Sequence, residues 1–234
     1  MLKKIVIGIF IVIIFLTVIV TVIVTYSMHP DGLDGANILY NSGQVAPEIN
    51  EEIIETLEEY QRINEDIVAI FAYKDLQLPI MNPGNNEAYF RTDIYGDYDS
   101  MGTPFVDETS NLLSSNVIIQ GHASSKNDNM FSFIAELVED SDSTFRIISE
   151  DGEVEYQMIG IAEVDLTQEN NLWLGYYQQE FRSGEMEQMI NEFLDRAFIQ
   201  YGAADVDDTS KLVTLVTCDV AEENSRFIVI AKKK

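Results

Sequence analysis

The chain has 234 residues, with 14 Lys and Arg against 40 Asp and Glu and a formal net charge of −26 at pH 7. Such a surface repels nucleic acid and anionic lipid headgroups, so we exclude both as partners and interpret the acidity as a solvated, soluble surface. The single cysteine, Cys218, excludes an intrachain disulfide framework and a thiolate zinc site.

The N-terminal segment differs sharply from the rest. Residues 5–24 carry no charge and are almost all Ile, Val, Leu or Phe, enough for a helix that crosses a bilayer. Lys3 and Lys4 precede this run, which places the N-terminus in the cytoplasm and the following chain outside. A cleaved signal peptide usually has a shorter apolar region, and residues 25–28 make a poor cleavage site. We therefore expect residues 1–26 to be a cytoplasmic tip and a retained transmembrane anchor.

After the anchor, residues 27–49 are polar and turn-rich and are interpreted as an extracellular stalk. Residues 50–234 are enough for one domain with its own core. Asn50 can cap a helix at the start of this domain. Its apolar residues would share one face, namely Ile53, Ile54, Leu57 and Tyr60.

The rest of the domain is rich in short apolar runs separated by turn residues, which favour an antiparallel barrel or sandwich. Two helices interrupt the runs, a short one at 130–138 and a longer one at 183–197. Ser183 can cap the longer helix, whose Met and Phe stripe is interpreted as core packing. We expect eight strands, at 67–73, 76–81, 103–106, 116–120, 145–149, 154–164, 211–217 and 227–231.

Two of these strands, near the end of the chain, form an antiparallel hairpin. Cys218 ends the first strand and Arg226 begins the second, so they should face each other across the hairpin mouth. An arginine beside a thiol favours the thiolate and can donate hydrogen bonds to an oxyanion. The alternative is a surface arginine that happens to begin a strand.

The domain holds one histidine, His122, at the exit of the strand at 116–120, where Gly121 is expected to allow a sharp turn. The other histidine, His29, lies in the stalk and is interpreted as inert. A Cys–His pair in this domain can therefore be only Cys218 with His122, and no Gly-x-Ser-x-Gly serine competes with it.

These segments resemble those of the sortase family, and within it the class B branch. Residues 116–122 (Asn-Val-Ile-Ile-Gln-Gly-His) are similar to its strand-Tyr-Gly-His segment, and residues 214–218 (Thr-Leu-Val-Thr-Cys) to its Leu-x-Thr-Cys motif. Arg226 follows the cysteine at the family's usual spacing. Weaker collinear matches complete the resemblance over about residues 50–231, at 78–80, 86–90, 102–107 and 130–131. The chain departs from the pattern at Gln120, where Tyr is usual, at Ala123, and in lacking a Gly-Trp within 67–71.

The resemblance implies a fold and a function. The fold is a closed β-barrel of about eight strands, with an N-terminal helix and a helix before the cysteine strand. The function is that of a membrane-anchored cysteine transpeptidase, without a cofactor or metal, whose catalytic residues are Cys218, His122 and Arg226. Its expected partners are an Asn-Pro-x-Thr-like sorting-signal peptide of exported proteins and an amine of the cell-wall precursor. Two alternatives stay open, a cysteine peptidase that uses water and a non-catalytic, membrane-tethered β-domain.

Overall fold

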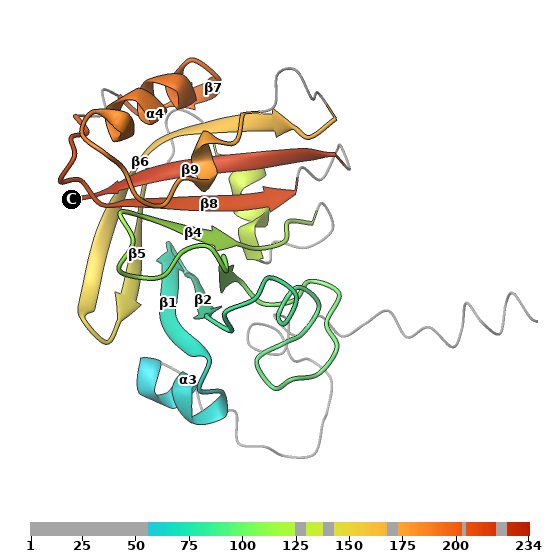
Figure 1. The fold of residues 1–234 in the computed structure, drawn as a ribbon. Helices are drawn as coiled ribbons and strands as arrows, with labels where there is room; N and C mark the ends of the chain where they lie inside the picture. Colours follow the sequence, from blue (N-terminus) through green and yellow to red (C-terminus); the bar gives the residue numbers. More distant parts are fainter. Residues whose placement is uncertain (1–55, 125–129, 138–142, 168–172, 203–204, 219–223) are drawn as a thin grey trace, which may run out of the picture. The chain divides into compact units, whose positions relative to one another are not determined.

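The computed structural model describes residues 56–124, 130–137, 143–167, 173–202, 205–218 and 224–234 (Figure 1). Within these ranges, no helix is long and apolar enough to cross a membrane. The expected anchor at residues 5–24 and the expected stalk at 27–49 lie outside the described residues.

The strands of the domain close into a barrel (Figure 1). Eight strands follow one another around it in the order β5-β1-β2-β3-β4-β8-β9-β6, and β6 pairs back with β5 to complete the ring. This architecture confirms the expected barrel of eight strands. In chain order they are β1 (Ile67–Tyr73), β2 (Leu76–Met81), β3 (Phe105–Val106), β4 (Asn116–Gln120), β5 (Thr144–Ser149), β6 (Gly152–Asp165), β8 (Leu212–Cys218) and β9 (Ser225–Lys233).

The barrel is mixed rather than antiparallel, which corrects the direction expected from the strand pattern. β2 pairs with β3, and β4 with β8, in parallel, whereas the other pairings of the ring are antiparallel. Alternation of apolar residues indicates which face of a strand is buried. It does not indicate whether the strand runs parallel or antiparallel to its neighbour. β4 and β8 are also distant in the chain, so no short hairpin turn fixes their relative direction.

Most of the core lies in two layers, one inside the barrel and one beneath the helix α4 (Glu185–Leu194), and a smaller third cluster packs around Leu57 and Tyr60. β9 shows the division, because its alternate residues belong to different layers. Val229 and Ala231 face the barrel interior, whereas Ile228 and Ile230 pack in the outer layer with Ile190 and Phe193 of α4. A strand segment buried on both faces is expected to be apolar throughout, as residues 227–231 of β9 are.

The helix α3 (Leu57–Ile63) begins the described part of the domain. Thr56 caps it in a capping box, in which Thr56 Oγ1 accepts from the Glu59 backbone and Glu59 Oε2 accepts from the Thr56 backbone. Leu57 and Tyr60 are buried, as expected. The expected cap Asn50 and the expected face residues Ile53 and Ile54 lie outside the described residues.

The helix α4 is shorter than the predicted 183–197, although its predicted apolar stripe is buried. Gly184, with a φ of 81°, occupies the N-cap, and Ser183 Oγ instead donates to Asp208 Oδ2 at 2.7 Å. At the other end, residues 197–200 form a further strand, β7 (Ala197–Gln200), which pairs with β6. The predicted helix at 130–138 is a 3₁₀ helix, η1 (Met130–Glu136), and a second one, η2 (Gly175–Tyr177), was not predicted.

Candidate active site

The hairpin of β8 and β9 places Cys218 and Arg226 opposite each other. Their backbones are direct partners in the antiparallel ladder, at the end of β8 and the beginning of β9. This register confirms that the two residues face each other across the hairpin mouth. Cys218 is the last residue of β8.

β4 brings His122 to the same edge of the barrel. β4 and β8 run parallel with Gln120 opposite Val216, and the Gly121 N–H donates to the Val216 carbonyl at 3.1 Å. Two residues beyond these partners lie His122, just past the end of β4, and Cys218, the last residue of β8. The structure therefore gathers the backbones of His122, Cys218 and Arg226 at one end of three adjacent strands.

Gly121 is required by packing rather than by the expected sharp turn. Its φ lies in the ordinary range, but a Cβ at this position would lie 2.8 Å from two ring carbons of Phe131. The Phe131 N–H also donates to the His122 carbonyl at 3.1 Å. Because Gly121 has no side chain, the backbone just after β4 can pass directly over the buried Phe131 ring. His122 then lies at the edge of the barrel.

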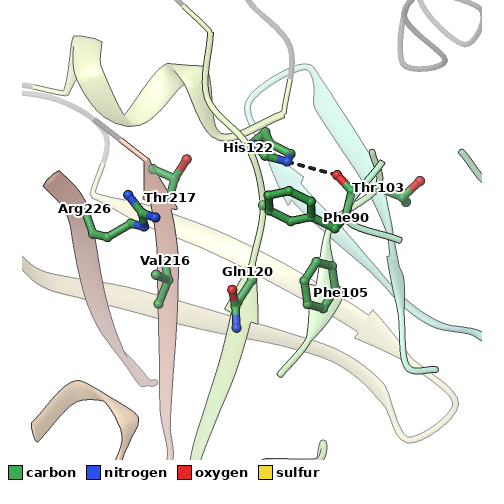
Figure 2. Close-up of a pocket in the computed structure, with 9 residues that line it drawn as sticks. Phe90, Thr103, Phe105, Gln120, His122, Val216, Thr217 and Arg226 are labelled. Carbon is green, nitrogen blue, oxygen red and sulfur yellow. Dashed lines mark hydrogen bonds between the residues drawn. The ribbon is translucent and has the colours of Figure 1, made fainter. Parts of the chain in front are cut away.

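His122 is held by the loop between β2 and β3. Its Nε2 lies 2.9 Å from the Phe90 carbonyl oxygen, and the Phe90 ring packs against the imidazole with the ring centroids 4.4 Å apart (Figure 2). Burial lowers the pKa of His122, and the charges of Arg91 and Arg226 lower it further, whereas the hydrogen bond to the Phe90 carbonyl raises it. The neutral imidazole is therefore favoured relative to a free histidine.

A pocket that is partly open to solvent lies between His122 and Arg226 (Figure 2). Thr217 is 2% exposed, and its Oγ1 is buried without a hydrogen-bond partner among the described residues. Buried hydroxyls are normally hydrogen-bonded, so Thr217 is an exception among the described residues. The pocket is lined by Phe90, Thr103, Phe105, Gln120, Gly121, His122, Val216, Thr217 and Arg226.

Gln120, where the family usually has Tyr, is tied to a buried carboxylate. Asp107 is 1% exposed and accepts hydrogen bonds from Asn86 Nδ2 at 3.0 Å, from the Thr109 backbone at 2.9 Å and from the Gln120 amide. These donors satisfy the carboxylate and fix the Gln120 side chain along one wall of the pocket.

Sequence reasoning found the three residues at the strand ends but not the rest of the pocket. Phe90 and Phe105 lie within the segments that resemble the family, and Thr217 directly precedes the cysteine. Nothing in the sequence alone marks them as lining residues, because Phe90 reaches His122 only through the path of a long loop.

Comparison with known proteins identifies the class. The family model described as "Sortase domain" matches residues 73–234 of this chain. The chain therefore belongs to the sortase family, and it is a sortase-type cysteine transpeptidase.

Within that family, the chain is similar to sortase B. Sortase B of Listeria monocytogenes is 24% identical over 212 residues, which cover 86% of this chain and 82% of the relative. The solved sortase B of Clostridium perfringens has a TM-score of 0.66 at 20% identity, covering 76% of this chain and all of that one. A Staphylococcus aureus sortase B–substrate complex has the same TM-score at 21% identity, covering 76% of this chain and 84% of that one.

Proposed function

We propose that this transpeptidase is anchored in the cell membrane and acts outside the cell, where it cleaves C-terminal sorting signals of exported proteins and joins them to a cell-wall amine. Cys218 is the nucleophile, His122 the general acid and base, and Arg226 a donor to the oxyanion. The observation that carries these assignments is the meeting of the three residues at one end of β4, β8 and β9, beside a pocket.

In the first half-reaction, the Cys218 thiolate attacks a backbone carbonyl of the signal peptide. Negative charge develops on the carbonyl oxygen, where Arg226 and backbone N–H groups donate hydrogen bonds. His122 then gives its proton to the departing amine, and the carboxyl half of the cleaved bond stays on Cys218 as a thioester.

In the second half-reaction, an amine replaces the leaving group. His122 takes a proton from the attacking amine, the new amide forms, and the Cys218 thiolate departs. Because an acceptor bound beside the thioester attacks in a nearly unimolecular step, a site that orients an amine favours ligation over hydrolysis.

Two observations support a peptide as substrate. The pocket combines apolar surface from Phe90, Phe105 and Val216 with the polar groups of Gln120, His122 and Arg226, a lining that suits a peptide. Among similar proteins, one sortase B is described as a substrate complex and another as complexed with triglycine, a short peptide with a free amine. For this chain we propose an Asn-Pro-x-Thr-like signal, cut after the Thr.

The test gives the full-length protein such a peptide with and without an oligoglycine or diaminopimelate-type amine and identifies the products by mass. We expect a thioester on Cys218 that accumulates without amine and becomes a ligated product with amine. Free acid that forms equally fast in both reactions would instead make the protein a hydrolase. A Cys218 that never acquires peptide, from any of a library of signals, would contradict the proposed nucleophile.

Catalytic variants test the assignments separately. Cys218→Ala should abolish the thioester. His122→Ala should reduce turnover by about 10²–10⁴-fold, the usual contribution of a positioned general acid or base. Near-normal turnover in the histidine variant would remove His122 from the mechanism and leave it as a structural residue.

A further inference from the structure

The imidazole of His122 is restrained by a backbone group that can only accept a hydrogen bond. Nε2 of His122 lies 2.9 Å from the Phe90 carbonyl oxygen (Figure 2). A peptide carbonyl has no proton to donate, so Nε2 must carry the hydrogen in both the neutral and the charged ring. The nitrogen that loses and regains a proton is then Nδ1.

The Phe90 carbonyl is itself held in place by a close backbone contact at Gly102. A Cβ on Gly102 would lie 2.3 Å from the Tyr89 oxygen and 2.5 Å from the Phe90 oxygen. Gly102 has a φ of +61°, and the neighbouring Thr103 N–H donates to the Tyr89 carbonyl at 3.0 Å. Any side chain at Gly102 would therefore have to displace the carbonyl that His122 contacts.

The far side of the same segment is also fixed. The Tyr89 hydroxyl donates to Asp66 Oδ2 at 2.9 Å and accepts from Asn64 Nδ2 at 2.8 Å. The Phe90 carbonyl thus lies between a rigid anchor at Tyr89 and the glycine backbone at Gly102. Its position is set before any substrate binds, as a preorganised site requires.

We propose that Nδ1 of His122 is the atom that exchanges protons during transpeptidation, and that Gly102 is a positioning residue that holds the Phe90 carbonyl against Nε2. The proposal rests on His122 being the general acid and base. When the C–N bond of the substrate breaks, its electron pair goes to nitrogen and Nδ1 supplies the proton. His122 is left neutral with its hydrogen on Nε2, and Nδ1 then accepts the proton of the attacking amine.

The first experiment reads the tautomer directly and does not depend on activity. The chain contains only two histidines, His29 and His122. Selective ¹⁵N-histidine labelling of the full-length protein therefore gives two imidazole spectra, and a His122→Gln variant assigns them. We expect neutral His122 to have its proton on Nε2 alone. A proton on Nδ1, or an even mixture of the two tautomers, would overturn the proposal even if His122→Ala confirms a catalytic role.

The second experiment tests Gly102 with a matched control. Gly102→Ala should release the carbonyl, give His122 a mixture of tautomers and lower kcat about tenfold to a hundredfold with little change in KM, the usual result of a small misplacement of a reacting group. Gly84→Ala places a methyl group at a similar φ of +72°, but with no atom within 4 Å. It should keep the wild-type tautomer and kcat.

The variants also show how the second part of the proposal fails. A Gly102→Ala protein with the wild-type tautomer and kcat would overturn the positioning role of Gly102. Equal losses in Gly102→Ala and Gly84→Ala would do the same, because backbone strain would then explain both. If Gly102→Ala does not fold, as judged by circular dichroism, Tyr89→Phe replaces it, because it removes the hydroxyl bonds to Asp66 and Asn64 that fix the same segment. A wild-type tautomer and kcat in Tyr89→Phe would then overturn the positioning of the Phe90 carbonyl.

Discussion

Arg226 is the residue whose chemistry depends most on the shape of its side chain. The pairing of Cys218 with Arg226 brings it to the hairpin mouth, and it lines the pocket together with His122. A guanidinium presents planar, directed donors, whereas a lysine ammonium is a flexible point charge. The proposed oxyanion role therefore requires more than a positive charge at this position.

We predict that Arg226→Lys lowers kcat about 10²–10³-fold although the charge is kept, the usual loss when one oxyanion donor is removed. Arg146→Lys is the control, because Arg146 makes an exposed ion pair with Glu153 at 2.9 Å. Single-turnover thioester formation would compare the two variants. A normal rate of thioester formation in Arg226→Lys would contradict the oxyanion role. Arg226 would then be a surface cation at the start of β9.

His122 gives a prediction about pH. Burial is the main cause that lowers the pKa of His122, so its titration midpoint should lie below the value of about 6.5 for free histidine. The unfolded chain then binds this proton more readily than the folded one. The stability that neutral His122 contributes is complete above about pH 6.5 and is lost as the pH falls through the folded pKa.

NMR titration of the labelled imidazole measures this midpoint. The difference in urea midpoint between wild type and His122→Gln, followed from pH 8 to pH 5, gives the linked stability while other titrating groups cancel. A midpoint at or above that of a free histidine would contradict the prediction, and so would a difference that does not change with pH.

At the scale of elements, the direction of the strands creates the site. Parallel β4 and β8 end at the same edge of the barrel, which brings His122 beside Cys218. Antiparallel β9 begins at that edge, which adds Arg226. If β4 and β8 were antiparallel neighbours, as the general strand pattern suggested, His122 and Cys218 would lie at opposite ends of the barrel. The mixed sheet is therefore a condition for the proposed mechanism.

Local patterns predicted the strands well where turn residues bound them. β1, β2 and β4 have the predicted bounds because polar or turn residues flank each apolar run. β7 was missed because no Gly or Pro separates it from α4, and Ala197 continues the apolar spacing of the helix. Its strand conformation depends on pairing with β6, a contact between distant segments. The contact of Phe90 with His122 escaped sequence reasoning for the same reason.

The helix α3 gives a prediction about stability. Leu57 and Tyr60 pack with Tyr89 and Phe105, beneath the loop that carries Phe90. Thr56→Ala removes the capping hydroxyl and should lower the free energy of unfolding by about 1 kcal/mol. Thr56→Ser keeps the hydroxyl and should be nearly neutral. Urea unfolding of the full-length protein compares the variants, and equal stability of Thr56→Ala and wild type would show that the cap contributes nothing.

At the scale of the whole molecule, the active site must lie on the same side of the membrane as its substrates. In the proposed function, a sorting signal and a cell-wall amine both reach the enzyme outside the cell. The proposed function therefore requires the anchor at residues 5–24 to hold the barrel on the extracellular side. Lys3 and Lys4 favour this orientation through the positive-inside tendency.

We predict that the barrel is extracellular and the N-terminus is cytoplasmic. In cells stripped of their wall, added protease should destroy the domain after residue 26 and spare an N-terminal tag placed before Lys3. Permeabilised cells are the control, because there the tag should be lost as well. A domain protected in intact cells would reverse the orientation. A secreted chain that lacks residues 1–26 would show that the segment is a cleaved signal, and the enzyme would then need another means of staying near the cell wall.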